Sequence, residues 1–591
     1  MANIRPVTVS RVQGGAPRPK VDYQVEYFGD LDTTTDPSSV QDQNAVDNLN
    51  VVFDSTRSVM SRPGYTKLLT TKTPSFIGGM FPLYQSTGIR QLVYASNTNL
   101  YIYNNAGGST QLVPGAGAPA NFTPNLVWSF DEYLDSVYGG DGVDSLIAYN
   151  GTNYSVANSG ISPQYVKTHT NRIYCVNKNS STLYFSDAGN PTSFPVNNFI
   201  QINTNDGQNI TGLSELLSNL VIFKDESVWI LTGEPLGAGN TTTIGNLQIR
   251  QANSSVGCSA FRTIQRVDQV IFFMHYSGIY VLQNYSVALV SPLLNATFLT
   301  GMNPGYINTC YGIYNSSRKK YILGYPSAVS TVPDSAIVWD GIARQYSRWD
   351  HLPGSCAINY KFSGQSESIF MGDPSMGNIY QLFSGNADIA GDNGNASSSS
   401  TTTLVDSTKA WTVNEFTDCR VMIGSNLGNY VTAVVASNTA TTLTFTTTLA
   451  SAVTAGTQYS IGYFTSYWKT KIFDFEATGY SKKYRFYNLF IDSENYPVLF
   501  GSAIDYAPCN FQKSFNMGIQ SSFWDSGVTW DTSGLIWDSN AGSIFGQANI
   551  GGTGRHIQII IGNNLANQPW RAIKHSFQYK LKKERTNIVT T

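Results

Sequence analysis

The sequence predicts an all-β protein, and three observations lead to that prediction. A short strand-like phrase returns about every 45 residues over the first two thirds of the chain, which is the length of one four-stranded β-propeller blade. Aromatic residues make up 13% of the chain and charged residues another 13%, against about 25% charged in an average globular protein. No long stretch shows the 3.6-residue apolar period of an amphipathic helix. We therefore expect a β-propeller of six or seven blades, with its central channel, together with a β-sandwich-like domain and a small inserted β-module.

The repeated phrase is a short apolar strand followed by polar turn residues. Its copies are NLYIYN at 99–104, LIAYNG at 146–151, TLYFSD at 182–187, VWILTG at 228–233, IYVLQN at 279–284, AIVWDG at 336–341 and NIYQLF at 378–383. In LVIFKDESVWILTG, at 220–233, two apolar strands flank a polar turn, which is the pattern of a β-hairpin. A single hairpin cannot bury its apolar face alone, so the copies must stack on one another. Because the spacing is uneven, an ordinary β-sandwich with hairpins at accidental intervals is the alternative.

We divide the chain into four regions. They are an N-terminal extended lead-in (1–70), a β-propeller (71–390), a flexible bridge with an inserted small β-module (391–465) and a C-terminal β-rich platform domain (466–591). The bridge is the low-complexity run GDNGNASSSSTTT, and polar runs of this kind mark boundaries. Propellers often close their ring with a strand from elsewhere in the chain. We therefore expect either the lead-in or residues 466–505 to complete the last blade.

The lead-in ends in the phrase SRPGY at 61–65. The Pro63-Gly64 pair is a turn signal, so a plain turn is the simpler interpretation. An anchoring role for Arg62 is the alternative.

Charge is nearly balanced over the whole chain, but it is unevenly distributed along it. The formal net charge of −2 gives no global attraction to nucleic acid or to an anionic membrane. Basic residues collect toward both ends: Arg5, Arg11, Arg18 and Lys20 precede the first acid, and Arg571, Lys574, Lys580, Lys582, Lys583 and Arg585 lie in the tail. These segments are either solvated tails or arms that dock on an acidic partner. Lys580, Lys582 and Lys583 are our candidate contacts.

The sequence contains no recognisable catalytic, cofactor or metal motif. Its five histidines form no HExxH or HxH pair and no zinc-like cluster with cysteine. No GxSxG elbow or Walker loop is present, and GAGAPA at 115–120 lacks the third glycine of a dinucleotide loop. The six cysteines lie far apart without a CxxC pair, so we expect free thiols in the core. We predict no enzymatic activity and assign no catalytic, cofactor-binding or metal-binding residues.

Half of the ten tryptophans are followed by Asp. Trp can cover a strand edge while Asp accepts hydrogen bonds from the next turn, so strand termination is the simpler interpretation. Trp524, Trp530 and Trp537 are closely spaced, and the alternative for them is an aromatic contact surface for a sugar or a protein partner.

Two segments resemble the latter part of the Asp-box turn of sialidase-type propellers. They are Asp187-x-Gly189-x-x-Thr192 and a counterpart at 525–530. Both have Phe where the Asp-box has Ser or Thr, and intact Asp-boxes are structural turns. We interpret both segments as turns.

Targeting and membrane signals are missing from the sequence. The opening MANIRPVTVSRVQGGAPRPK has no signal-peptide apolar core, and no run approaches the ~20 apolar residues of a membrane span. We therefore expect synthesis in a reducing cytoplasm and no membrane span.

Several phrases are informative through their order. They are RPGY at the end of the lead-in, hairpins of the LVIFKDESVWILTG kind, Gly257-Cys258-Ser259-Ala260 followed by VIFFMHYSGIYVLQ, and WDSGVTWD in the tail. Together they resemble the tail nozzle (tail tubular) proteins of short-tailed, podovirus-like bacteriophages. The resemblance covers 1–395 and 466–591, whereas 404–465 is similar to small β-modules inserted in phage virion proteins.

The resemblance implies a structural virion protein: a homo-hexamer below the portal and adaptor rings that forms a conduit and gate for genome ejection. Its implied partners are the tail adaptor protein above, tail fibres or spikes, and genomic DNA that passes non-specifically. The implied location is the virion tail, assembled in the host bacterial cytoplasm, with the propeller at the periphery and the platform along the axis. A near-neutral chain suits such a tube, because strongly cationic walls would hold DNA.

Two other functions stay open at this point. One is a head–tail stopper or a DNA-retaining plug, which belongs to the same machine. The other is a glycan-binding or glycan-cleaving β-propeller, and the inserted module could also be a fibre attachment point.

Overall fold

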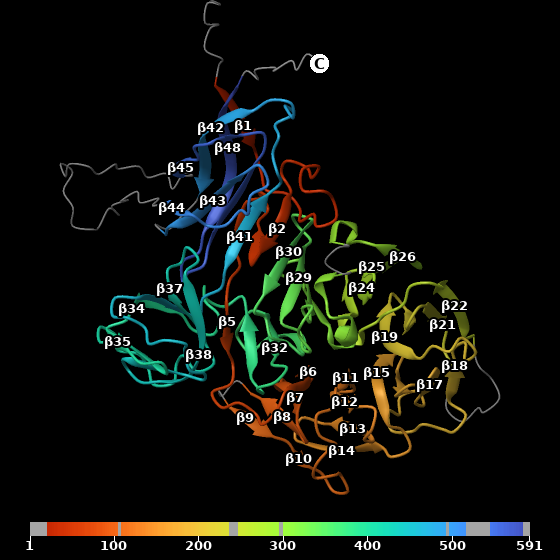
Figure 1. The fold of residues 1–591 in the computed structure, drawn as a ribbon. Helices are drawn as coiled ribbons and strands as arrows, with labels where there is room; N and C mark the ends of the chain where they lie inside the picture. The colour runs from red at the N-terminus through yellow and green to blue at the C-terminus, as the bar shows by residue number, and fades with distance from the viewer. Residues whose placement is uncertain are drawn as a thin grey trace, which may run out of the picture.

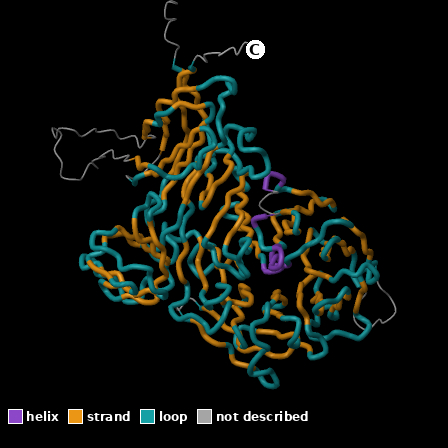
Figure 2. The backbone as a smooth tube through the Cα atoms, in the orientation of Figure 1, coloured by secondary structure: helices purple, strands orange, loops and turns teal. Residues whose placement is uncertain are grey.

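The computed structural model describes residues 20–104, 108–235, 246–294, 300–491, 496–515 and 544–582. Strands dominate these ranges, and the helical segments are short turns such as η1 (Phe261–Thr263), η2 (Pro292–Leu294) and η4 (Pro304–Thr309). Figure 2 shows how thoroughly strand and loop make up the chain. The prediction of an all-β protein is therefore confirmed.

The middle of the chain folds into seven consecutive sheets, each built on four antiparallel strands. Sheets 1 to 3 contain β6 (Ile77–Tyr84), β7 (Arg90–Ser96), β8 (Asn99–Tyr103) and β9 (Ser109–Gln111); β11 (Ser129–Tyr133), β12 (Ser136–Gly140), β13 (Leu146–Tyr149) and β14 (Asn153–Asn158), with β10 (Val113–Pro114) added in parallel; and β15 (Pro163–His169), β16 (Arg172–Asn177), β17 (Thr182–Phe185) and β18 (Phe199–Gln201). Sheets 4 to 6 contain β19 (Ile210–Leu216), β20 (Asn219–Lys224), β21 (Val228–Thr232) and β22 (Gln248–Asn253); β23 (Gln265–Val267), β24 (Val270–His275), β25 (Gly278–Gln283) and β26 (Ser286–Leu289); and β27 (Tyr311–Asn315), β28 (Lys320–Tyr325), β29 (Ser335–Asp340) and β30 (Gln345–Asp350). Sheet 7 contains β31 (Cys356–Tyr360), β32 (Ser368–Gly372), β33 (Ile379–Leu382) and β5 (Tyr65–Lys67).

The repeated sequence phrase has one consistent place in these sheets. Each of its seven copies falls on the third strand of one sheet: β8, β13, β17, β21, β25, β29 and β33. The spacing varies because the loops between the sheets differ in length, while the strands keep their order. The prediction that the hairpins stack is confirmed.

The seven sheets follow one another around a ring (Figure 1). The first strand of each sheet packs against the first strand of the next, in the order β6, β11, β15, β19, β23, β27 and β31, and β31 packs against β6. Sheet 7 takes its outer strand from the N-terminal part of the chain, since Leu382 pairs with Tyr65 and Tyr380 pairs with Lys67. Of the two segments that could have completed this sheet, the chain uses the lead-in.

Side chains cross the centre of the ring, where the sequence led us to expect a channel. The guanidinium of Arg262 in η1 donates to the carbonyl oxygen of Ser355, ahead of sheet 7, at 2.7 Å and also to that of Gly78 in sheet 1. The ring of Phe261 lies 5.1 Å from that of Tyr165 in sheet 3. These contacts tie sheets on different sides of the ring together.

Two further sheets form a sandwich from both ends of the described chain. One contains β3 (Val51–Phe53), β4 (Val59–Ser61), β48 (Arg571–Leu581), β42 (Lys482–Ile491) and β45 (Ile544–Asn549), with β1 (Val21–Val25) paired to β48 and β46 (Thr553–Gly554) to β42. The other contains β2 (Ala45–Leu49), β41 (Ser466–Thr470), β47 (Ile557–Asn563), β43 (Val498–Ile504) and β44 (Lys513–Phe515). We call this unit the terminal sandwich. Aromatic rings fill the space between its sheets, as where Tyr487 stacks on Phe500 at 5.2 Å.

The structure uses the lead-in differently from the extended segment that we expected over 1–70. Residues 21–61 supply four strands of the terminal sandwich, and the next strand, β5, joins the ring. A short strand such as β1 buries only one face, so it is stable only when paired, here with β48.

The module is a seven-stranded sheet with a core of its own. Its strands are β34 (Asp392–Asn395), β35 (Ser398–Ser399), β36 (Thr403–Val405), β37 (Arg420–Gly424), β38 (Tyr430–Asn438), β39 (Thr442–Phe445) and β40 (Gln458–Ile461). The run expected to be a flexible bridge thus forms the first strands of this sheet. Its Ser and Thr residues close a tight turn, because the hydroxyl of Ser400 accepts from the backbone N–H groups of Thr402 and Thr403.

Arg62 lies where the ring, the terminal sandwich and the module meet, and its side chain is 1% exposed. Its two terminal nitrogens each donate to one carboxylate oxygen of Asp388 at 2.8 Å. Its Nε donates to Oδ1 of Asn50 at 2.8 Å, and the guanidinium lies 4.1 Å from the ring centroid of Phe464. Arg62 is therefore an anchor rather than part of a plain turn.

We predict that Asp388→Asn is strongly destabilising. The substitution would leave the guanidinium of Arg62 buried without its counter-charge, which typically costs about 3–5 kcal/mol. Urea unfolding followed by tryptophan fluorescence measures the effect. Arg266→Lys, at an exposed position on β23, is the control. If Asp388→Asn lost no more unfolding free energy than Arg266→Lys, the anchor role of Arg62 would be contradicted.

We also predict that stability falls in mild acid because of His575. Its ring is 1% exposed and stacks on Phe28 at 5.4 Å, and burial lowers its pKa from 6.5 to about 3. The unfolded chain then takes up a proton below pH 6.5 that the folded chain does not, so each unit of falling pH costs about 1.4 kcal/mol. His575→Phe should reduce the difference in unfolding free energy between pH 7 and pH 5. If His575→Phe kept the same difference in unfolding free energy between pH 7 and pH 5, the assignment of the acid sensitivity to His575 would be contradicted.

Candidate functional site

The candidate contact residues predicted from the sequence have different outcomes. Trp524, Trp530, Trp537 and Lys583 lie outside the described residues. Lys580 lies near the end of β48 and is half-buried, and Lys582 follows the strand and is exposed. The two candidates that the structure describes, Lys580 and Lys582, therefore belong to the terminal sandwich, on the sheet that contains β1, β48, β42 and β45.

A row of lysines crosses this sheet at one end. Lys580 pairs with Lys483 of β42, and Lys20 lies beside Lys580 because the next residue, Val21, pairs with Tyr579. Like charges in one row repel each other, so the row is favourable only when water, salt or an anionic partner screens it. Sequence reasoning missed Lys483, since only the register between β42 and β48 brings it to Lys580.

A buried lysine supports this row from below. Lys482 has no exposed surface, and its Nζ donates to the carbonyl oxygens of Ala477 at 2.8 Å, Tyr480 at 3.2 Å and Arg555 at 2.8 Å. Burial lowers the pKa of Lys482. By donating to these three carbonyl oxygens, Lys482 holds the loops that contain them in place beneath the basic row.

Four residues further along β48, a row of uncharged polar side chains crosses the same strands of this sheet. It consists of Gln24 in β1, Ser576 in β48, Asn488 in β42 and Gln547 in β45. The amide of Asn488 donates to the hydroxyl of Ser576 at 3.0 Å, and that of Gln547 donates to Oδ1 of Asn488 at 3.0 Å. We call the basic row and this amide row together the polar face.

Opposite charges complete the polar face near β1. Nζ of Lys574 lies 3.8 Å from the carboxylate of Glu26 and 4.8 Å from the ring centroid of Phe490. Charges of both signs thus alternate with neutral amides. Asn488 and Ser576 are each only 7% exposed, so the charged side chains together with Gln24 and Gln547 are the part of this face that can form hydrated contacts with a polar or anionic partner.

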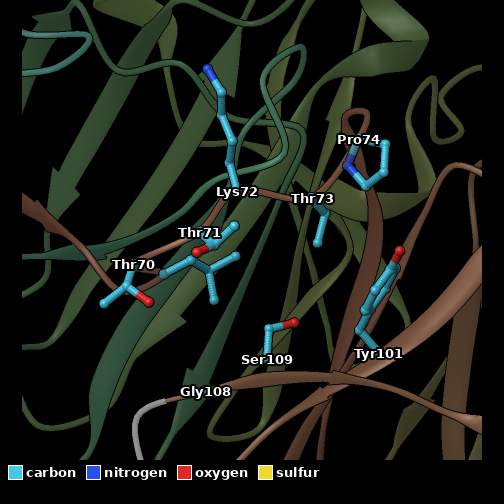
Figure 3. A pocket seen from close by; sticks show the side chains of 9 residues that line it. Thr70, Thr71, Lys72, Thr73, Pro74, Tyr101, Gly108 and Ser109 are labelled. Carbon is cyan, nitrogen blue, oxygen red and sulfur yellow. The ribbon is translucent and has the colours of Figure 1, made fainter. Parts of the chain in front are cut away.

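A second candidate site is a shallow depression of about 380 Å³ between sheets 7 and 1 (Figure 3). Hydroxyl groups and one aromatic ring line much of it, contributed by Thr70, Thr71, Thr73, Ser109 and Tyr101. The ring of Tyr101 is held by stacking on Tyr94 at 5.4 Å. Hydroxyls around one ring are groups that can contact a sugar.

The Asp-box-like segment at 187–192 is a structural turn, as predicted. Oδ2 of Asp187 accepts from the hydroxyl of Ser193 at 2.8 Å, and its Oδ1 accepts from the amide of Asn198 at 3.2 Å. Both carboxylate oxygens therefore accept from residues that follow the segment, and the counterpart at 525–530 lies outside the described residues.

The described cysteines all lie in the core. Cys175, Cys258, Cys310, Cys356, Cys419 and Cys509 are buried free thiols. Burial raises the pKa of Cys258 to about 12 and that of Cys509 to about 11, so these thiols stay protonated. The prediction of ordinary core thiols is confirmed.

Membrane-spanning helices are absent from the described part of the chain. No helix there combines the length and the apolar composition needed to cross a membrane.

Comparisons with known proteins do not assign a family. No family model matches this chain, and no curated protein is significantly similar to it. Similar solved structures include virginiamycin B lyase from Staphylococcus aureus, with 9% identity, 54% of this chain and 97% of that chain covered, and a TM-score of 0.36. The computationally designed Ika8 protein has 9% identity, with 61% of this chain and 100% of that chain covered and a TM-score of 0.33. PorZ of the type-IX secretion system of Porphyromonas gingivalis has 12% identity, with 59% of this chain and 43% of that chain covered and a TM-score of 0.34. With TM-scores this low, these similarities assign no function to this chain.

We predict that the double substitution K483E/K580E weakens binding to duplex DNA of mixed sequence. Non-specific binding at low salt should itself be weak, and each lost phosphate contact should lower the salt slope by about 0.9. Fluorescence anisotropy at several salt concentrations measures both quantities. Lys361→Glu, at an exposed position on the ring, is the control. Equal affinity and slope in both variants would show that the basic row does not contact DNA.

Proposed function

We propose that this chain is a structural subunit of the tail nozzle of a short-tailed phage, in which a seven-bladed β-propeller lies outside and the terminal sandwich lines the conduit. The observation that carries the proposal is the joining of a closed ring of sheets to a sandwich built from both ends of the described chain. The ordered phrases that resemble tail nozzle proteins supply the assignment to that machine.

Seven blades are supported by three independent features. The seven phrase copies fall on the third strands of seven sheets, the first strands contact one another around the ring, and β5 supplies the last outer strand. A propeller closed in this way has its last blade hydrogen-bonded to the strand that leads directly into its first blade. Such a ring is stiff enough to serve as a peripheral support.

The conduit of the proposed assembly would run along the symmetry axis of six subunits, outside the centre of any one propeller. Arg262 and Phe261 cross that centre and contact other sheets of the ring. Duplex DNA needs an open passage, which these side chains obstruct. The propeller is therefore a scaffold in this account.

The polar face of the terminal sandwich is the surface that we assign to the conduit wall. Its amide row is uncharged, and its lysines are partly offset by Asp22 and Glu26 on the neighbouring strand. Wall charges of both signs give phosphates little net attraction, so DNA would pass without being retained. A uniformly basic wall would retain it.

A glycan-binding propeller is the second candidate, and the depression in Figure 3 favours it. Tyr101 would stack on a sugar ring while Thr70, Thr71 and Thr73 contact its hydroxyl groups. Saturation-transfer NMR with bacterial polysaccharide fragments would detect this binding. Loss of the signal in Tyr101→Ala but not in Tyr506→Ala, an exposed tyrosine of the sandwich, would support it.

The nozzle proposal predicts that the purified chain assembles into hexamers at micromolar concentration. Mass photometry should find a species of six times the chain mass, and negative-stain images should show sixfold rings. A species that stays monomeric as concentration rises, with no ring in any image, would contradict the proposal and give precedence to the glycan-binding propeller.

A further inference from the structure

Two exposed surfaces lie on opposite sides of the molecule. In the view of Figure 1 the terminal sandwich stands above the ring, the module lies on the left, and β22 and β26 lie on the right. In a closed assembly with the sandwich toward the axis and the ring outside, the left and right sides of this view face the neighbouring subunits. Each contact in such an assembly joins two different surfaces, so the two sides must be complementary.

The outer edges of sheets 4 and 5 form the first surface. β22 and β26 are the outer strands of these sheets and lie in contact with each other. Arg250 of β22 is exposed, and its guanidinium lies 5.6 Å from the ring centroid of Tyr285, which precedes β26. On β26, Val287 is half-buried and Leu289 is 42% exposed. We call these four residues the rim patch.

The side chains of the rim patch share one side of the two strands. Tyr285 and Val287 pack on the core between sheets 4 and 5, and Leu289 has the same orientation as Val287 because alternate residues of a strand share a face. The ring of Tyr285 is held in place, since its hydroxyl accepts from Nδ2 of Asn219 at 2.8 Å. The rim patch is therefore an apolar surface with one positive charge.

The second surface is residues 412–415 of the module, between β36 and β37, which we call the module loop. Val413 in this loop is 65% exposed, and Glu415 is exposed as well. Oε2 of Glu415 accepts from the backbone N–H of Thr412 at 3.2 Å, so the carboxylate lies beside the residue next to Val413. The module loop thus presents one apolar side chain and one negative charge.

The module loop is fixed from behind by Asn438 of β38. Nδ2 of Asn438 donates to the carbonyl oxygen of Thr412 at 2.8 Å, and its Oδ1 accepts from the backbone N–H of Phe416 at 2.9 Å. The backbone N–H of Asn414 also donates to the carbonyl oxygen of Asn438, at 2.9 Å. A loop that is already ordered loses little conformational entropy when it docks on a partner.

The charges of the two surfaces are opposite and unpaired. Within the described residues, neither Arg250 nor Glu415 forms a salt bridge. Contact between the two surfaces would pair these charges and remove Val413 and Leu289 from water.

We propose that the module loop of one subunit docks on the rim patch of the neighbouring subunit, with Val413 against Leu289 and Glu415 against Arg250. The partner is thus a second copy of this chain. This inference rests on the proposed function, because the assembly of the nozzle brings these two sides of different subunits together. The module then joins neighbouring subunits at the periphery of the ring of six.

Charge reversal tests the contact. Sedimentation velocity of the full chain over a concentration series gives the concentration at which half of the chain is hexameric. Glu415→Arg and Arg250→Glu should each raise this concentration about tenfold, because two like charges then meet. The double variant E415R/R250E restores opposite charges, so its value should return to within about threefold of the wild type. Glu367→Arg, at an exposed position on sheet 7, should assemble like the wild type.

The outcomes separate this contact from the nozzle proposal. Wild-type hexamers that are equally stable in both single variants would overturn the contact and leave the nozzle proposal intact. A double variant that assembles no better than the single variants would also overturn it, because the two charges would then act independently. A wild-type chain that stays monomeric at every concentration would contradict the nozzle proposal itself, and the contact with it.

Discussion

The architecture depends on one buried guanidinium. All five N–H donors of Arg62 have acceptors: the two oxygens of Asp388, the amide oxygen of Asn50 and the carbonyl oxygens of Pro63 and Asp350. Asn50 belongs to the terminal sandwich, Asp350 ends sheet 6 of the ring, and Asp388 precedes the module. A buried charge is tolerated only when it is paired and fully hydrogen-bonded. The arginine is therefore satisfied only when the ring, the terminal sandwich and the segment that leads into the module have assembled around it.

The same position explains how the chain closes its ring. Arg62 stands three residues before β5, so fixing the arginine also fixes the entry of β5 into sheet 7. On the other side of the junction, Trp349 in β30 donates to the carbonyl oxygen of Val51 at 2.9 Å and Arg348 pairs with Asp47 at 2.8 Å. Ring closure and docking of the sandwich are thus coupled through adjacent residues, and the two units form one body.

Local patterns predicted what depends on local structure. The seven phrases located the third strand of each sheet, because a short apolar run that ends in polar turn residues is a hairpin signal. Pairings between distant segments could not be predicted in this way. The pairs β5 with β33 and β1 with β48 depend on which surfaces meet in the folded chain, and the run at 391–403 forms strands because β34 pairs with β40 and β35 pairs with β36. Likewise, Lys580 was found from its place in a basic tail, but its neighbour Lys483 follows only from the register of β42 on β48.

A cryo-electron microscopy reconstruction of the purified chain tests the central claim most directly. The account predicts a sixfold ring with seven-bladed propellers outside, polar faces of the terminal sandwiches around an open axis, and continuous density for Arg62 between the three units of each subunit. A monomer, or a ring whose axis is lined by the propellers while the polar faces point outward, would contradict it.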